Sequence, residues 1–515
     1  MAQDRARSSF RRRWLAPMSA LVVVALGLFS VLYLLDHYVT GGVHTGSPTH
    51  PLARFFLFDP STIAGSVSAL GGLVAAILGI VITVVSIVVQ LSAGRYAGVA
   101  GMFLRDRVNM SVLGFYVIAC VLGVWLSAGV RSDFVPRASV LAMMLVTTIG
   151  LVLMAPYFAY VFWFLEPENI IARIGSDALE TARAGGAEAD PFEVAALQVR
   201  LVSAMEEFTD IASSSISGKD KIIASHAVDA LKDLAVDYVR LKPDAAPAWF
   251  KIGAGIRQDP AFVAMDPESR LDLEQRRTWV EYKVLKQYLG VFNEALPAMK
   301  EINYLIAIDT RYIGEAAAAA GDAELETLAL RYMNSYLRAT LNAKDVRTAY
   351  NLMNQYRLLV EALLRMRRGA SAIAAAEHMR YYGHTGLDLK LPFVTETVAY
   401  DLATLCQLAQ QVASPDEEKL LEVFLSLNRP TPGRDETVLP GVRKAQAKLA
   451  AHYLQAGKRE RADAIRAAMA SEPAHRLRAI RDELLRVDSK DFWEITDRDR
   501  NFDYMPPEQR AHLKA

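Results

Sequence analysis

One apolar run of this 515-residue chain carries a regular stripe of small and hydroxyl-bearing side chains. Its positions recur at alternating intervals of four and three residues, which places them on one face of an α-helix. The rest of the run is mostly Val, Ile and Leu, as expected of a lipid-facing surface. In a bilayer, such a stripe marks where another backbone, or water, comes close. The stripe, called the seam below, comprises Gly65, Ala69, Gly72, Ala76, Gly79, Thr83, Ser86, Gln90, Ala93 and Ala97.

Four apolar segments are long enough to cross a bilayer core, which needs about 20 helical residues. They span residues 15–35, 63–91, 110–130 and 138–165. The first follows a run of arginines but lacks a small-residue cleavage signal, so we interpret it as an uncleaved anchor. Pro156 is predicted to kink the last span.

Basic residues beside the spans predict their direction, because arginine-rich loops stay in the cytoplasm. The N-terminal arm and the loop between the second and third spans carry Arg5, Arg7, Arg11, Arg12, Arg13, Arg95, Arg105 and Arg107. The other two loops carry only Arg54, Arg131 and Arg137. We therefore expect a cytoplasmic N-terminus and, after four spans, a cytoplasmic C-terminal region.

The chain beyond Glu166 is predicted to be all-α, because apolar residues recur there at three- and four-residue spacing. Helices are expected over Phe192–Ile211, Ile222–Val239, Arg276–Leu296 and Leu325–Leu341. The predicted organisation is a basic cytoplasmic arm (1–14), a four-helix transmembrane domain (15–165), a juxtamembrane helical region (166–245) and a cytosolic helical domain (246–515).

Part of the cytosolic domain resembles tetratricopeptide-type helical hairpins. Residues 449–458, followed by Ala462–Ala464, combine small residues with a Gly turn, as such a hairpin requires. Residues 336–356 look like a degenerate second copy, although no constant period can be fixed. A stacked-hairpin array and an irregular bundle both remain open.

Charge and cysteine content exclude several classes of protein. The 57 basic and 57 acidic residues balance, so we expect no nucleic-acid partner. Cys120 and Cys406 are isolated, so they form neither a disulfide framework nor a metal motif. Phosphate-loop, nucleophile-elbow, zinc-protease and dinucleotide motifs are missing. We therefore predict a non-enzymatic protein without a cofactor.

Histidines gather in or beside the first outer loop, at His37, His44 and His50, with Asp36 and Asp59 nearby. Three histidines could hold a metal ion. Their spacing is loose and the loop is rich in Gly, Thr and Pro, so we favour solvent-exposed histidines over a metal site.

The loop from Arg95 to Arg107 is a second candidate site. Its arginines set the topology and can contact anionic headgroups, at about 1 kcal/mol for each basic residue near the surface. Asp106, between Arg105 and Arg107, indicates a salt link to the cytosolic helices. A gating or docking role for this loop is the alternative.

Two other stretches mix aromatic and charged residues. The first is Tyr304–Ile313, with Asp309 and Arg311. The second is the tail from Trp493 to Tyr504, whose charges alternate in sign at Asp497, Arg498, Asp499, Arg500 and Asp503. A tail folded back onto the domain through ion pairs is one interpretation, and a partner-binding tail is the other.

Between about residues 62 and 240 the chain resembles a bacterial family of predicted membrane proteins, domain of unknown function 2254. The matching stretches are 62–66, 90–92, 95–96, 103–107, 112–114, 134–137, 170–174 and 205–212. The chain departs from the family at Ser217-Gly218-Lys219-Asp220, where the family has a Pro-containing turn. The family has no assigned activity, so the resemblance implies topology and a bacterial inner (plasma) membrane location rather than a mechanism.

The seam allows two structural interpretations. It can be close helix packing, within or between subunits, or the lining of a pore in a homo-oligomer, with weak hydrogen-bonding groups and no fixed charge. We expect an oligomeric channel-like or sensing protein with the second span as the central helix. The alternative is a membrane-anchored scaffold whose cytosolic hairpins bind a protein partner.

Overall fold

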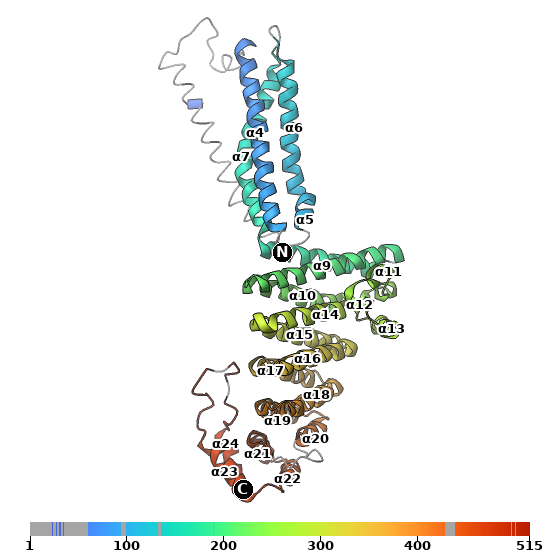
Figure 1. Cartoon of the computed structure of the whole chain (residues 1–515), viewed down its shortest axis with the longest axis vertical. Coiled ribbons are helices and arrows are strands. Elements are labelled where there is room, and N and C mark those ends of the chain that lie inside the picture. The colour runs from blue at the N-terminus through green and yellow to red at the C-terminus, as the bar shows by residue number, and fades with distance from the viewer. Residues whose placement is uncertain are drawn as a thin grey trace. The chain divides into compact units, whose positions relative to one another are not determined.

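The protein is described from a computed structural model (Figure 1). The structure describes residues 60–93, 99–131, 135–188, 190–427, 438–495, 497–499 and 501–514, with a few single positions before residue 60. The chain divides into two compact units, Met1–Ile170 and Ile171–Ala515. Over these described ranges, both units are built of helices and turns and contain no β-strand, so the predicted all-α class is confirmed.

The first unit contains α4 (Pro60–Ala93), α5 (Val99–Arg105), α6 (Arg107–Gly129) and α7 (Arg137–Leu165). Three segments, Thr62–Gln90, Arg107–Gly129 and Arg137–Leu165, are long and apolar enough to cross a membrane. They coincide with the second, third and fourth predicted spans. The first predicted span, 15–35, lies outside the described residues.

Glycines let the helices of the first unit approach closely. A Cβ atom on Gly123 of α6 would lie 3.1 Å from the Cα atom of Gly71 on α4, so a side chain there would require the two helices to move apart by a few tenths of an ångström. Ser68 and Ser127 join the same two helices through a 3.2 Å hydrogen bond. The Tyr116 hydroxyl of α6 donates to the Gly150 carbonyl of α7 at 2.8 Å. These contacts hold α4, α6 and α7 together by close packing and a few hydrogen bonds, as expected where lipid removes the hydrophobic drive.

The second unit begins within α8 and continues as a long series of helices. Their bounds are α8 Pro167–Ala187, α9 Pro191–Ser217, α10 Lys221–Leu241, η2 Lys242–Asp244, η3 Pro247–Phe250, α11 Ala254–Arg257, α12 Pro260–Val263, α13 Pro267–Arg276, α14 Trp279–Ala298, α15 Lys300–Ala320, α16 Ala323–Asn342, α17 Val346–Arg365, α18 Gly369–Asp388, α19 Pro392–Gln411, α20 Glu417–Ser426, α21 Pro440–Gln455, α22 Arg459–Ala468, α23 Ala474–Arg486, α24 Pro507–Ala511 and η4 His512–Lys514. The helices expected from periodicity correspond to α9, α10, α14 and α16.

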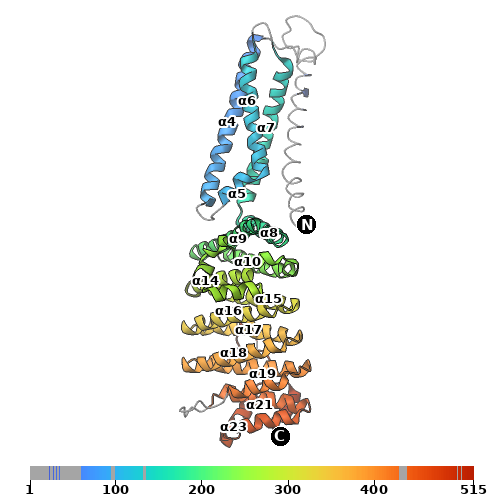
Figure 2. The same cartoon turned by 90° about the vertical axis from the view of Figure 1, so that its right-hand side faces the viewer.

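Most helices of the second unit stack one above another (Figure 2), and they form two layers (Figure 1). In one layer, α10, α15, α17, α19 and α21 pack on one another in that order. In the other layer, α9, α14, α16, α18 and α20 do the same. From α14 to α20, each helix therefore contacts its neighbours in sequence and the next helix of its own layer. This is an ordered array rather than an irregular bundle.

A 23-residue step repeats along this array. The turns between consecutive helices from α15 to α20 each contain one residue with a left-handed backbone. These residues lie 23 positions apart: Gly321, Lys344, Arg367, Lys390 and Ala413. After each of them, a backbone N–H returns to the last helical turn, as Asp345 does to the Thr340 carbonyl at 3.0 Å. One pair of helices thus takes 46 residues, which is longer than the 34 residues of a tetratricopeptide repeat. The hairpin predicted around residues 449–464 corresponds to α21 and α22, joined at Gly457, and its tetratricopeptide type stays a prediction.

The C-terminal segment closes the array. Ala451 of α21 packs in one apolar cluster with Ile480, Leu484 and Met505. Between α23 and α24, residues 488–505 leave this cluster and return to it; we call them the strap. Arg510 of α24 closes the base of the strap, because its guanidinium donates to the Val487 carbonyl, to Asp488 at 3.0 Å and to the Met505 carbonyl at 2.9 Å.

Candidate functional site

The seam of α4 faces away from the other described helices of its unit. The eight seam residues from Gly65 to Gln90 are all exposed in the single chain, whereas Ala93 and Ala97 lie outside the residues whose side chains are described. A Cβ atom added at Gly65, Gly72 or Gly79 would meet no atom within 4 Å. The seam is therefore an open surface of the chain with respect to α6 and α7.

The opposite face of α4 makes the contacts within the unit. Val67, Val74, Ile77, Val81 and Val85 are buried. Val74 follows Gly72 by two residues, which turns the helix by about 200° at 3.6 residues per turn. Gly71, which is not a seam residue, is the glycine that contacts α6. The packing interpretation of the seam thus does not apply to the contacts of α4 with α6 and α7.

The polar end of the seam is hydrogen-bonded within its own helix. The Thr83 hydroxyl donates to the Gly79 carbonyl at 2.8 Å. A hydroxyl bonded in this way still offers oxygen lone pairs to a facing helix or to water. The seam is accordingly apolar enough to tolerate lipid and polar enough to accept a hydrogen bond.

The arginine loop is organised around Asp106. Asp106 caps α6, because its carboxylate accepts from the backbone N–H groups of Val108 and Asn109 at 3.0 and 3.1 Å. The Tyr160 hydroxyl of α7 donates to the same carboxylate at 2.7 Å. Tyr157 donates to the Asn109 side chain at 2.5 Å. Helix α7 thereby fixes the turn between α5 and α6.

The predicted residues of this loop fall at different places. Arg105 ends α5 and Arg107 begins α6, whereas Arg95 lies outside the described residues. The sequence did not predict Tyr157 and Tyr160 as partners of Asp106. The capping role was visible in principle, because Asp followed by a new apolar run is an N-terminal signal.

Asp309 of α15 is almost completely buried, with 1% of its surface exposed. The Tyr288 hydroxyl lies 3.1 Å from its Oδ2 atom and 2.9 Å from the Val228 carbonyl oxygen. A hydroxyl has one proton, so it can serve both acceptors only if Asp309 is itself protonated and donates to Tyr288. Burial, reinforced by the negative charge of Asp229, raises the pKa of Asp309 to about 7.

Two buried lysines form ion pairs with acidic residues that the sequence did not identify as partners. Lys242 contacts Glu281 at 2.8 Å and Asp322 at 2.5 Å. Lys283 contacts Asp259 at 2.5 Å and Glu206 at 3.1 Å. Each lysine bridges segments distant in sequence, so no local pattern could identify the pairs. They fasten the start of the array through charge-assisted hydrogen bonds.

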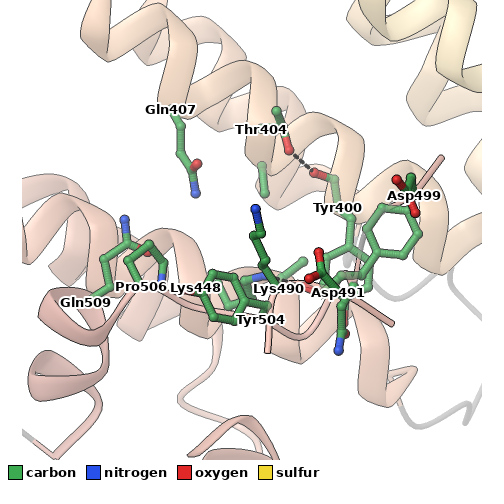
Figure 3. Close-up of a pocket in the computed structure, with 14 residues that line it drawn as sticks. Tyr400, Thr404, Gln407, Lys448, Lys490, Asp491, Asp499, Tyr504, Pro506 and Gln509 are labelled. Carbon is green, nitrogen blue, oxygen red and sulfur yellow. Dashed lines mark hydrogen bonds between the residues drawn. The ribbon is translucent and has the colours of Figure 1, made fainter. Parts of the chain in front are cut away.

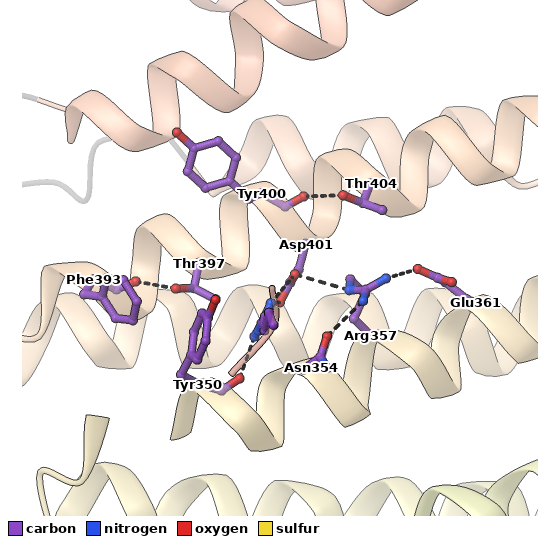
Figure 4. A network of polar contacts seen from close by, with 10 residues as sticks. Tyr350, Asn354, Arg357, Glu361, Phe393, Thr397, Tyr400, Asp401 and Thr404 are labelled. Atoms are coloured by element: carbon purple, nitrogen blue, oxygen red, sulfur yellow. Dashed lines mark hydrogen bonds and ion pairs between the residues drawn. The ribbon is translucent and has the colours of Figure 1, made fainter. Parts of the chain in front are cut away.

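The tip of the strap inserts an arginine between α17 and α19. Arg498 donates to both carboxylate oxygens of Asp401, at 2.8 and 3.1 Å, and to the Tyr350 carbonyl at 2.6 Å. Its guanidinium lies 4.1 Å from the centre of the Tyr350 ring. Arg357 approaches Asp401 from the other side at 3.4 Å and is also held by Glu361 and Asn354 (Figure 4).

Other strap residues contact α17, α19 and α21. Asp497 pairs with Arg347 at 2.9 Å. Phe502 stacks on Tyr400, with ring centres 4.8 Å apart and planes inclined by 7°. Asp503 accepts from the Tyr400 hydroxyl at 2.6 Å and pairs with Lys444 at 2.7 Å. The predicted fold-back of the tail through ion pairs is confirmed for Asp497, Arg498 and Asp503, whereas Arg500 lies outside the described residues.

Cavities lie on both sides of the strap. One, of about 460 Å³, is lined by residues that include Thr404, Gln407, Lys448 and Lys490 (Figure 3). The other, of about 420 Å³, has aromatic walls that include Tyr350, Phe393 and Phe492. Tyr400, Asn501 and Phe502 line both cavities. The strap therefore covers the groove formed by α17, α19 and α21 without filling it.

The histidines of the first outer loop, His37, His44 and His50, lie outside the described residues. Within the ranges that the structure describes, no three His, Cys, Asp or Glu side chains gather closely enough to hold a metal ion.

Three helices long and apolar enough to cross a membrane define the class: this is a helical membrane protein that carries a second, helical unit. Residues 11–235 match the model of the family described as predicted membrane protein (DUF2254). The match begins earlier than the stretch identified from the sequence. Residues 217–220, where the sequence departs from the family pattern, lie between α9 and α10. Gly218 and Lys219 form the turn, and Asp220 caps α10. No curated protein and no solved structure matches the chain.

Proposed function

We propose that this protein is a homo-oligomeric, channel-like membrane protein in which α4 of each subunit faces the oligomer centre through the seam. One observation carries the proposal: the seam is exposed in the single chain, while the valine-rich face opposite makes the contacts with α6 and α7. A small-residue face with hydroxyl groups suits close approach of a second helix or of water.

The second unit then acts as the sensing part in the cytoplasm, without catalysis. Its two-layered array presents long continuous surfaces, as stacked helical pairs generally do. The proposal includes a multi-pass topology in the bacterial inner membrane, with the N-terminus and the C-terminus both in the cytoplasm. The turn between α5 and α6, fixed by Tyr157 and Tyr160, is the element we expect to transmit a change between α4 and α7.

A membrane-anchored scaffold is the second candidate function. The strap groove favours it, because a groove with charged and aromatic anchors is a surface on which a peptide segment can dock. In that case the helices of the first unit serve as an anchor, and the tetratricopeptide-like interpretation of α21 and α22 describes part of the docking surface.

The mass of the full chain in detergent separates the two functions. The channel proposal expects an oligomer, whereas a monomer would contradict it, because the helices of one chain cannot enclose an ion path. Ion flux into liposomes is then compared between wild type, Gly79→Leu and Ser86→Leu. We expect flux in wild type that both substitutions reduce; no flux in any of the three favours the scaffold.

Ile82→Leu is the matched control. Ile82 is 50% exposed on the same helix but is not a seam residue. This substitution keeps the volume and polarity of the side chain, so mass and flux should match wild type. A loss of flux with Ile82→Leu equal to that with Gly79→Leu would mean that the assay reports damage to α4 in general.

A further inference from the structure

We propose that the groove formed by α17, α19 and α21 is a binding site for an extended segment of a partner protein. This segment carries an arginine followed four residues later by an aromatic and then an acidic residue. The strap, with Arg498, Phe502 and Asp503, is its intramolecular stand-in. The proposal is independent of self-association through α4.

The strap makes contacts of the kind a bound peptide makes. Side chains enter separate sites along the groove, and their charges alternate with those of the groove: Asp497 with Arg347, Arg498 with Asp401 and Asp503 with Lys444. Arginine suits the central site, because its Nη1 atom donates to both oxygens of Asp401 while its Nη2 atom donates to the Tyr350 carbonyl and the guanidinium lies over the Tyr350 ring. Lysine has one ammonium and no planar guanidinium, so it cannot make the carboxylate, carbonyl and ring contacts together.

The groove is built to persist when the strap leaves. Asp401 keeps a cationic partner in Arg357, which Glu361 and Asn354 hold in place independently of the strap. Phe502 and Asp503 meet Tyr400, whose position is set by its place in α19. Release of Arg498 therefore does not leave Asp401 as a buried charge without compensation.

The strap can leave without opening the C-terminal cluster. Arg510 joins both ends of the strap by hydrogen bonds to Val487, Asp488 and Met505. Met505 also packs in the cluster with Ile480 and Leu484. These contacts lie at the base, so displacement of the tip need not disturb them.

The strap is also accessible and fits its groove incompletely. Trp493 and Ile495 are 80% and 95% exposed, so one arm of the strap carries apolar side chains that the chain itself does not cover. The cavities of about 460 and 420 Å³ leave space beside Phe502 on both sides. A partner segment can add contacts there that the strap does not make, which is the condition for displacing it.

The test uses the full chain in detergent and a fluorescent synthetic peptide of residues 494–505. The strap of the chain is weakened by Arg498→Ala with Phe502→Ala, and peptide binding is followed by fluorescence anisotropy. A tethered segment competes at an effective concentration of about millimolar. We therefore expect the weakened chain to bind the peptide at least about tenfold more tightly than wild type does.

Two matched changes test the chemistry. A peptide in which Arg498 is replaced by Lys should bind at least about tenfold more weakly, because lysine cannot hold Asp401 and the Tyr350 carbonyl with two separate nitrogens while it covers the Tyr350 ring. In the weakened chain, Asp401→Asn should reduce binding of the arginine peptide to the level of the lysine peptide. Equal binding of both peptides, or equal binding to wild-type and weakened chains, would overturn the proposal.

Hydrogen exchange distinguishes a displaceable strap from a structural one. In the weakened chain, we expect faster exchange within the strap and unchanged protection in α17 and α19. Loss of protection in those helices would show that the strap is part of the fold and would overturn the proposal.

A wild-type dimer that Arg498→Ala converts to monomer would show that copies exchange straps, and would also overturn it. Gly79→Leu should leave peptide binding unchanged, which separates this result from the fate of the channel proposal.

Discussion

Replacing Asp309 by Asn should remove a pH dependence of stability from the helical array. In the folded chain the pKa of Asp309 is raised to about 7 by burial and by Asp229, with Lys232 opposing and Asp233 adding to the effect. An unfolded aspartate titrates near 3.9, so the folded state holds the proton more tightly over about pH 4 to 7. Stability contributed by this group is therefore greatest at low pH and is lost as the pH rises through 7.

The size of the effect follows from the pKa difference. Each unit corresponds to about 1.4 kcal/mol, so between pH 5 and pH 8 the folded state loses on the order of 2–3 kcal/mol through Asp309. Asparagine does not titrate and can still donate to the Tyr288 oxygen. We expect Asp309→Asn to have a higher Tm than wild type at pH 8, by several degrees, and a smaller advantage or none at pH 5.

Thermal unfolding of the full chain in detergent at pH 5, 6, 7 and 8 measures this difference. Asp177→Asn is the control, because its side chain is 62% exposed and its loss should change stability by less than about 0.5 kcal/mol. If wild type and Asp309→Asn lose stability in parallel between pH 5 and pH 8, Asp309 does not titrate in this range and the argument from Tyr288 fails.

Three further substitutions test other parts of the structure. Gly123→Leu should destabilise the first unit by about 1–3 kcal/mol because of the contacts with Gly71 and Met143. Gly129→Leu is the control on the same helix, because Gly129 is exposed and a Cβ atom there meets no atom within 4 Å; heating followed by size-exclusion chromatography compares the two. Lys242→Ala should cost about 3–5 kcal/mol in unfolding experiments, because Glu281 is left buried without its cation, and the double change Lys242→Met, Glu281→Met should recover much of this loss. Tyr160→Phe removes the hydrogen bond to Asp106 and should speed hydrogen exchange at the turn between α5 and α6, whereas Tyr312→Phe, at a 44% exposed side chain, should not.

The membrane helices could be predicted because hydropathy is a local property. The spans expected at 63–91, 110–130 and 138–165 end within three residues of α4, α6 and α7. The face of α4 that contacts its own unit could not be predicted in the same way. Gly71 and Gly72 are neighbours in sequence, and only the three-dimensional arrangement of α4 and α6 shows that Gly71 makes the contact.

The 23-residue step of the array could not be predicted from the sequence, because most of its turns lack the residue that usually marks such a turn. Left-handed turn positions usually carry glycine, which is the signal a sequence offers. Here only Gly321 does, and lysine, arginine and alanine take the other positions at a cost of about 1–2 kcal/mol each. The packing of 20-residue helices on both sides of each turn supplies the compensation.

The strap was predicted in outline and missed in detail. Alternating charges at residues 497–503 indicated ion pairs with the domain. They could not indicate Asp401 as the partner of Arg498, because the two residues are 97 positions apart and Asp401 lies in an amphipathic helix like the others. Long-range side-chain pairing depends on the completed stack of helices.

Cysteine cross-linking tests the exposed seam most directly. Single cysteines are introduced at Gly72, Gly79 or Ser86, and separately at Val74 or Val81, in a chain with Cys120→Ser and Cys406→Ser. A single cysteine can form a disulfide only with a second copy. Under mild oxidation in membranes, we predict cross-linked dimers for the three seam positions and none for the two positions on the buried face. No dimers from any seam position, or equal dimers from both faces, would contradict self-association through the seam of α4.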